Sequence, residues 1–129
     1  MPQNQQTGAA GSGYGHECGK KIIAALGGKK LNSRSNVFLL DGKRYTVHCA
    51  RKRTTSVGVT YLVLKNLDAV LGAFQQEDGS YRLLKLSAKQ YRDNMYPTRS
   101  KGPSAGRVGM VRRAVFEDIG TLFKLVRLR

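Results

Sequence analysis

The sequence predicts an α+β domain in which an N-terminal helix packs on a mostly antiparallel or mixed five-stranded sheet, followed by a C-terminal helical segment. Two observations lead to this fold class. One stretch has apolar residues at helical spacing, and it precedes several short apolar segments separated by glycine-containing turns. The length of 129 residues suits one domain, which we expect to span residues 14–129. Residues 1–13 are polar and glycine-rich, so we expect a disordered tail there.

The predicted helix runs from Tyr14 to Leu26. Apolar residues at positions i, i+4, i+7 and i+8 share one face of it, namely Cys18, Ile22, Ala25 and Leu26. Gly27 and Gly28 follow directly and predict the end of the helix, because glycine readily adopts the left-handed conformation that helices use at their C-termini.

A β-hairpin is predicted next. The apolar run 37–40 reads as a strand, and Asp41-Gly42 is a two-residue turn signal because both residues tolerate positive φ. In the strand that follows, alternation places two sets of side chains on opposite faces. One set is Tyr45, Val47 and Cys49, and the other is Thr46, His48 and Ala50.

Three more strands are predicted further along the chain. Residues 57–64 are rich in β-branched side chains and read as one strand. Residues 69–74 and 80–86 read as two others, joined by a turn at Glu77-Asp78-Gly79.

The last third of the chain mixes helix and loop signals. Ser87 and Gln90 have the spacing of a capping box, which predicts a short helix to about Met95. Residues 96–109 hold prolines, glycines and cations, and predict a loop. Apolar residues from 111 to 126 fit a helical stripe, although a strand over 122–128 is an alternative.

The charge balance points to a polyanionic partner. Lys and Arg number 23 against 8 Asp and Glu, a formal net charge of +15. Nucleic acid is the first candidate, since cations that replace the counterions of phosphates bind strongly. The cations expected to contact it fall into two groups, one around the 45–50 strand and one in or after the 96–109 loop: Lys43, Arg44, Arg51, Lys52 and Arg53, then Arg99, Lys101, Arg107, Arg112 and Arg113.

Other classes of partner and location fit less well. An anionic membrane is disfavoured, because no apolar run approaches 18 residues and no basic amphipathic helix carries aromatic anchors. The first residues lack the pattern of a signal peptide, so a cytoplasmic protein is expected. Cys18 and Cys49 read as two reduced, buried thiols, and neither histidine has the neighbours of a zinc site.

A family resemblance enters on these residues. Three segments carry the resemblance: Tyr14-Gly-His-Glu17 continuing to Gly27-Gly28, then NVFLLDGKRYTVHCAR, and then AVLGAFQQEDGSYRLLKL. The chain resembles a PD-(D/E)XK, restriction-endonuclease-like nuclease domain over roughly residues 14–95. The resemblance implies that fold, a nucleic-acid substrate with DNA favoured over RNA, and Mg²⁺-dependent phosphodiester hydrolysis.

The same resemblance exposes departures at the catalytic positions. The metal-binding Asp of the family falls near Val37, its Glu at Thr46 and its Lys at His48, and only Glu17 survives of the set. A shifted register would make Asp41 a ligand, so Glu17 and Asp41 are the candidate Mg²⁺ ligands and His48 the candidate base, which completes a catalytic set. Each of these residues also has a structural explanation. Glu17 is a carboxylate near the start of a helix, Asp41 is a turn residue, and His48 is a sheet residue that packs or contacts phosphate.

Three functions therefore remain open. The chain is expected to bind nucleic acid on a nuclease-like scaffold. A second hypothesis is an active Mg²⁺-dependent endonuclease using Glu17, Asp41 and His48, with a homodimer as one way to complete its site. A third is a structural RNA- or DNA-binding nucleoprotein component, ribosome-associated or viral, without catalysis.

Overall fold

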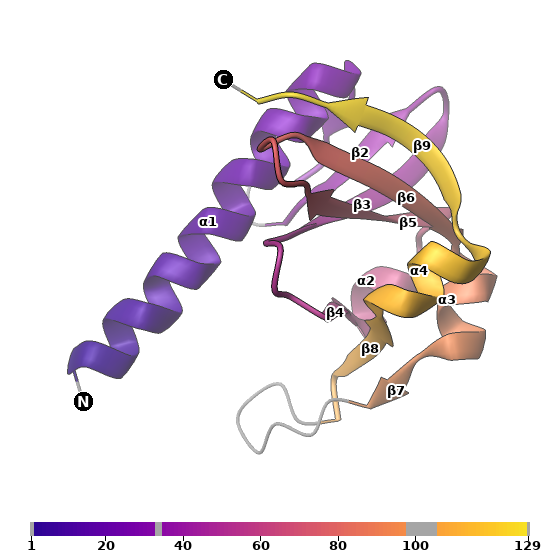
Figure 1. Cartoon of the computed structure of the whole chain (residues 1–129). Helices are drawn as coiled ribbons and strands as arrows, with labels where there is room; N and C mark the ends of the chain where they lie inside the picture. The colour runs from indigo at the N-terminus through magenta and orange to yellow at the C-terminus, as the bar shows by residue number, and fades with distance from the viewer. Residues whose placement is uncertain (1, 33–34, 98–105, 129) are drawn as a thin grey trace.

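The structure, a computed structural model, describes residues 2–32, 35–97 and 106–128, with side chains from residue 13 onward (Figure 1). Among these residues one helix precedes the first strand, three more lie between later strands, and most neighbouring strands are antiparallel, which makes the fold α+β. In chain order they are α1 (Pro2–Leu26), β1 (Lys29–Lys30), β2 (Val37–Leu40), β3 (Lys43–Ala50), β4 (Ser56–Thr60), α2 (Tyr61–Leu64), β5 (Ala69–Gln75), β6 (Tyr81–Ser87), α3 (Ala88–Asn94), β7 (Tyr96–Pro97), β8 (Val108–Arg112), α4 (Arg113–Ile119) and β9 (Thr121–Val126).

Helix α1 ends where the sequence predicts and begins much earlier. Gly27 has a φ of 75°, its N–H donates to the Ala24 carbonyl at 3.1 Å, and the Gly28 N–H donates to the Ile23 carbonyl at 3.0 Å. This pair of bonds is a Schellman motif. The helix starts at Pro2, so α1 includes residues that precede the predicted start at Tyr14, and the expected disorder of residues 1–13 stays a prediction. Proline suits a first helical position, and extending an existing helix avoids the cost of nucleation.

The larger sheet contains six strands in the order β1-β2-β3-β5-β6-β9. Strands β3 and β5 are parallel, and every other neighbouring pair in this sheet is antiparallel. Asp41 and Gly42 join β2 to β3 with φ values of 52° and 76°, which is the left-handed pair of a type I′ turn, and confirm the predicted hairpin.

A second sheet was not predicted. The segment 57–64 divides at Thr60, whose side chain accepts a hydrogen bond from the Val63 N–H at 3.3 Å and caps α2. The N-cap outweighs the β-propensity of the residues that follow. Strand β4 pairs with β8 and β8 with β7, so the single five-stranded sheet of the prediction becomes a six-stranded and a three-stranded sheet.

The C-terminal part also differs from its predicted helical stripe. The stripe combined residues of β8, α4 and β9, which lie on three separate elements. Gly120 ends α4 at a point where a Cβ atom would stand 2.4 Å from the Phe116 carbonyl oxygen, so a side chain is excluded there. The alternative strand over 122–128 overlaps β9. Upstream, the Ser87–Gln90 capping box is confirmed, and β7 and the start of β8 fall within the predicted loop 96–109.

Two hydrophobic clusters cover the two faces of the larger sheet. Helix α1 packs on one face, where Cys18, Ile22 and Ile23 meet Val47 and Cys49. On the other face the second sheet, α3 and α4 bury a separate cluster that includes Val57, Val70, Phe74, Tyr91 and Phe116. In Figure 1 the first turns of α1 extend away from the sheets. Within the described residues no helix is both long and apolar enough to span a bilayer.

Candidate nucleic-acid interface

The predicted nucleic-acid-binding cations lie in several places. Lys43 and Arg44 are exposed where β3 begins, and Arg51 is exposed just beyond its end. Seven residues at about 3.3 Å each separate Arg44 from Arg51 by about 23 Å. Arg107 is exposed beside α2, where its carbonyl accepts a hydrogen bond from the Tyr61 N–H. Arg99 and Lys101 fall outside the described residues.

The densest group stands at the turn between β3 and β4. Arg51, Lys52 and Arg53 are consecutive and exposed, and the turn is closed by a 3.0 Å hydrogen bond from the Thr54 N–H to the Arg51 carbonyl. Arg112 joins them from a distant part of the sequence, because it is the register partner of Ser56 in the β4–β8 pair. We refer to these four residues, Arg51, Lys52, Arg53 and Arg112, as the basic cluster.

Arg113 supports the basic cluster from behind. Its backbone N–H donates to the Thr55 carbonyl at 2.7 Å, and its guanidinium donates to the Lys52 carbonyl at 3.2 Å. The guanidinium carbon also lies 4.8 Å from the centre of the Phe74 ring, and Nε lies 3.7 Å from the Glu117 carboxylate. Arg113 therefore holds the β3–β4 turn against α4, and it shares the Glu117 carboxylate with Arg82.

The charges of the basic cluster are largely unopposed. Among the described residues, only Lys52 of the four has a carboxylate within 4 Å, at 3.3 Å from Glu77. The side chain of Glu77 is 93% exposed, so water and salt screen this pair and it contributes little. The cluster therefore keeps most of its positive potential for an external anion.

Aromatic rings hold two of these arginines in place. The Arg51 guanidinium lies 4.2 Å from the centre of the Tyr14 ring, and that of Arg112 lies 5.6 Å from the centre of the Tyr96 ring. Tyr96 is itself fixed by a 3.0 Å hydrogen bond between its hydroxyl and Ser56. Stacking on a ring face leaves the edge N–H groups of a guanidinium available to bind a phosphate. Sequence reasoning missed this role of Tyr14 and Tyr96, because nothing in the spacing pairs either tyrosine with an arginine.

The structure does not bring Glu17 and Asp41 together. Glu17 is exposed on α1, and the adjacent Cys18 packs against Cys49 near the end of β3. Asp41 stands before the start of β3, and six residues from Lys43 to Cys49 amount to about 20 Å. Its positive φ identifies Asp41 as a turn residue. These two carboxylates are therefore too far apart to bind the same ion.

The positions that align with the other expected ligands are filled by residues with structural roles. Val37 is the register partner of Thr46, and the Thr46 hydroxyl donates to the Asn36 carbonyl at 3.4 Å. His48 is half-buried on the same face as Thr46, and burial lowers the pKa of its imidazole. In the part of the chain that the structure describes, the His48 ring forms no hydrogen bond.

These residues do not fit a magnesium ion. Mg²⁺ requires several oxygen ligands around one point, and Val37, Thr46 and His48 supply no carboxylate. Across residues 13–32, 35–97 and 106–128, no three His, Cys, Asp or Glu side chains gather as a metal-binding group.

Comparison with known proteins gives no assignment, since the chain matches no protein-family model and no curated protein.

Proposed function

We propose that this chain is a nucleic-acid-binding protein whose contact surface is centred on the basic cluster. The observation that carries the proposal is that strand pairing places Arg112 beside the segment that follows three consecutive exposed cations, with one weak carboxylate partner among the described residues. Phosphates are the natural ligand for such a group, because each contact releases condensed counterions. The net charge of +15 extends the attraction over the whole surface.

The nature of the ligand is part of the same proposal. DNA is favoured over RNA on the resemblance to nuclease domains, and a cytoplasmic location is consistent with it. The divergence of Val37, Thr46 and His48 from the expected ligands supports a scaffold that binds without cutting. A structural nucleoprotein component would use the same basic cluster, and a preference for RNA over DNA would favour that second function.

A binding measurement with a charge-matched control tests the proposal. Fluorescence anisotropy with labelled duplex DNA, single-stranded DNA and RNA should give affinities that fall steeply with salt. The double variant Arg51→Ala/Arg53→Ala should bind more weakly, and should lower the slope of log affinity against log salt by about 2. Lys89→Ala/Arg92→Ala removes the same charge from exposed positions on α3 and should bind nearly as the parent does.

Two results would count against the proposal. Equal losses in both double variants would mean that only net charge matters and that the basic cluster has no special role. Affinity that is independent of salt would exclude phosphate contacts as its source. A plasmid incubated with Mg²⁺ or Mn²⁺ separately tests cutting, and nicking that is abolished by Asp41→Ala would revive the endonuclease hypothesis.

A further inference from the structure

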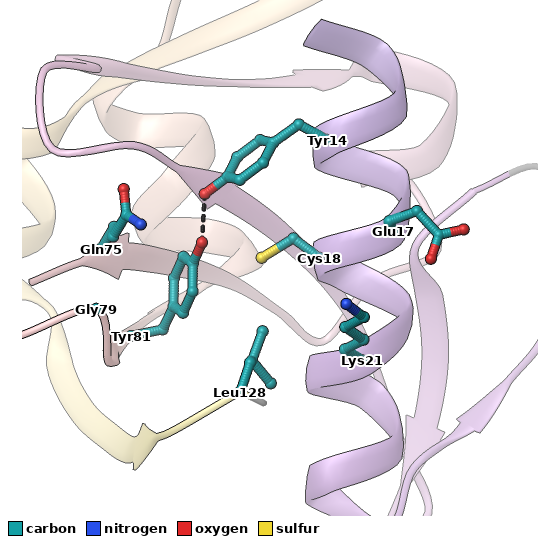
Figure 2. A pocket seen from close by; sticks show the side chains of 8 residues that line it. All are labelled: Tyr14, Glu17, Cys18, Lys21, Gln75, Gly79, Tyr81 and Leu128. Atoms are coloured by element: carbon teal, nitrogen blue, oxygen red, sulfur yellow. Dashed lines mark hydrogen bonds between the residues drawn. The ribbon is translucent and has the colours of Figure 1, made fainter. Parts of the chain in front are cut away.

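A cavity of about 280 Å³ opens between α1 and the strand ends of the larger sheet. Residues of α1, of the β5–β6 hairpin and of the segment after β9 line it: Tyr14, Glu17, Cys18, Lys21, Gln75, Gly79, Tyr81 and Leu128. Figure 2 shows the Cys18 sulfur pointing toward the two tyrosine hydroxyls, while Glu17 points away. Cys18 therefore supplies the thiol among the residues that line the cavity.

A second thiol lies behind the first. Cys49 on β3 packs in the same buried cluster as Cys18, and the two side chains are almost fully buried, at 6% and 4% exposure. Cys18 lines the cavity and Cys49 does not, so a small molecule in the cavity would meet Cys18 first. Helix α1 approaches the sheet very closely at this level, because a Cβ atom on Gly19 would stand 2.2 Å from the Asn36 side-chain nitrogen.

The surroundings of Cys18 favour its thiolate form. The hydroxyls of Tyr14 and Tyr81 are hydrogen-bonded to each other at 2.5 Å, and the Cys18 sulfur points toward them (Figure 2). The hydrogen bond with Cys49, then those with Tyr81 and Tyr14 and the charge of Lys21, lower the pKa of Cys18 to about 7. The contact with Cys18 and burial raise the pKa of Cys49. One thiol of the pair is thus activated and the other is kept protonated.

We propose that Cys18 is a site of oxidation by hydroperoxides and that Cys49 resolves it to an intramolecular disulfide between α1 and β3. In the first step the Cys18 thiolate attacks a peroxide oxygen, the O–O bond breaks, and the leaving hydroxide takes a proton to become water. Cys18 is then a sulfenic acid. In the second step the Cys49 sulfur attacks the Cys18 sulfur, the S–O bond breaks, and water leaves with the Cys49 proton. The two thiols lose two electrons, and hydrogen peroxide gains them as it becomes two waters.

The raised pKa of Cys49 does not block the second step. Its largest cause is the hydrogen bond with Cys18, which depends on Cys18 as a thiol or thiolate. Conversion of Cys18 to a sulfenic acid removes that cause and provides an electrophilic sulfur beside Cys49. The product joins two elements that already pack together, so the fold is retained.

Intact mass spectrometry on the whole chain tests the inference. The reduced protein is treated with hydrogen peroxide and then with iodoacetamide. We expect the mass to fall by two hydrogen atoms, both cysteines to resist alkylation, and peptide mapping to link Cys18 to Cys49. A thiol reductant should restore both alkylation sites. Two freely alkylated cysteines after peroxide treatment, or a disulfide between two chains, would overturn the proposal.

Two single variants separate the roles of the thiols. With dimedone present, Cys49→Ser should accumulate the adduct of a Cys18 sulfenic acid, because no resolving thiol remains. Cys18→Ser should form no adduct at Cys49. The reverse pattern would contradict the assignment of Cys18 as the reactive thiol. If either serine variant fails to fold, the peptide map of the parent protein still decides whether the disulfide forms.

Discussion

The guanidinium of Arg51 rests 4.2 Å from the ring centre of Tyr14, so the first helix and the end of β3 meet at the edge of the basic cluster. The hydroxyl of the same tyrosine reaches Tyr81 on the other side. The ring of Tyr14 therefore contacts the proposed nucleic-acid surface at Arg51, and its hydroxyl contacts Tyr81 in the cavity that Cys18 lines.

Removing the Tyr14 ring should weaken nucleic-acid binding. Tyr14→Ala leaves Arg51 without its stacking partner, so more of its side-chain freedom must be lost on binding. A cation–π contact at an exposed site contributes about 0.5–1 kcal/mol, so we expect roughly a two- to fivefold higher Kd for a DNA duplex by anisotropy. Tyr14→Phe keeps the ring and should bind as the parent does. A loss as large in the phenylalanine variant would show that the hydroxyl, and not the ring, matters.

Arg112 and Arg113 should have opposite phenotypes although they are adjacent. Arg113→Ala removes the hydrogen bond to the Lys52 carbonyl and the contacts with Phe74 and Glu117, and should lower the free energy of unfolding by about 1–2 kcal/mol. Arg112→Ala should leave stability within about 0.5 kcal/mol and weaken nucleic-acid binding. Urea unfolding and anisotropy measure the two effects, and equal destabilisation by both substitutions would be inconsistent with this division of roles.

Acidification should destabilise the fold through His48. Burial lowers the pKa of this imidazole in the folded state, so below the ordinary value of 6.5 the unfolded chain binds more protons than the native one. The free energy of unfolding should therefore fall as the pH drops from 6.5, until the folded pKa is passed. His48→Gln should flatten this part of the pH profile in urea titrations, and a profile that stays unchanged would assign the effect to other groups.

Two glycines of α1, one turn apart, should respond in opposite directions to alanine. A Cβ on Gly19 meets the Asn36 amide, which donates to the Gly15 carbonyl at 3.1 Å, so Gly19→Ala must displace that side chain. We expect a loss of about 1–3 kcal/mol, as for other overpacked cores. Gly15→Ala meets no atom within 4 Å and should stabilise the helix by about 1 kcal/mol. Thermal unfolding of both variants checks the contrast.

Local signals in the sequence predicted local structure well. The Asp41-Gly42 turn, the glycine end of α1 and the Ser87 capping box each depend on a few neighbouring residues, and the structure contains all three. The predicted strand over 57–64 holds only as far as Thr60, after which α2 begins, and the predicted helical stripe over 111–126 holds only for α4, because its residues come from β8, α4 and β9. Thr60 and Gly120 mark the true boundaries, and each acts through a specific contact that periodicity does not include.

The sequence predicts which cations belong to the candidate site, but it does not predict how the fold brings them together. The excess of cations indicates a polyanionic partner, and Arg51, Lys52 and Arg53 are visible as a run. The inclusion of Arg112 depends on the pairing of β4 with β8, in a second sheet that no local pattern indicates. The same limit applies to Cys18 and Cys49, since only the packing of α1 on β3 makes them neighbours.

The register of Ser56 with Arg112 has a thermodynamic consequence. A denatured chain keeps every one of its cations, but it no longer holds Arg112 beside the β3–β4 turn. A polyanion that prefers the assembled group must then bind the native state more tightly than the denatured one, and by linkage it raises the melting temperature in proportion to that preference. The pairing of β4 with β8 therefore contributes both to ligand affinity and to conformational stability.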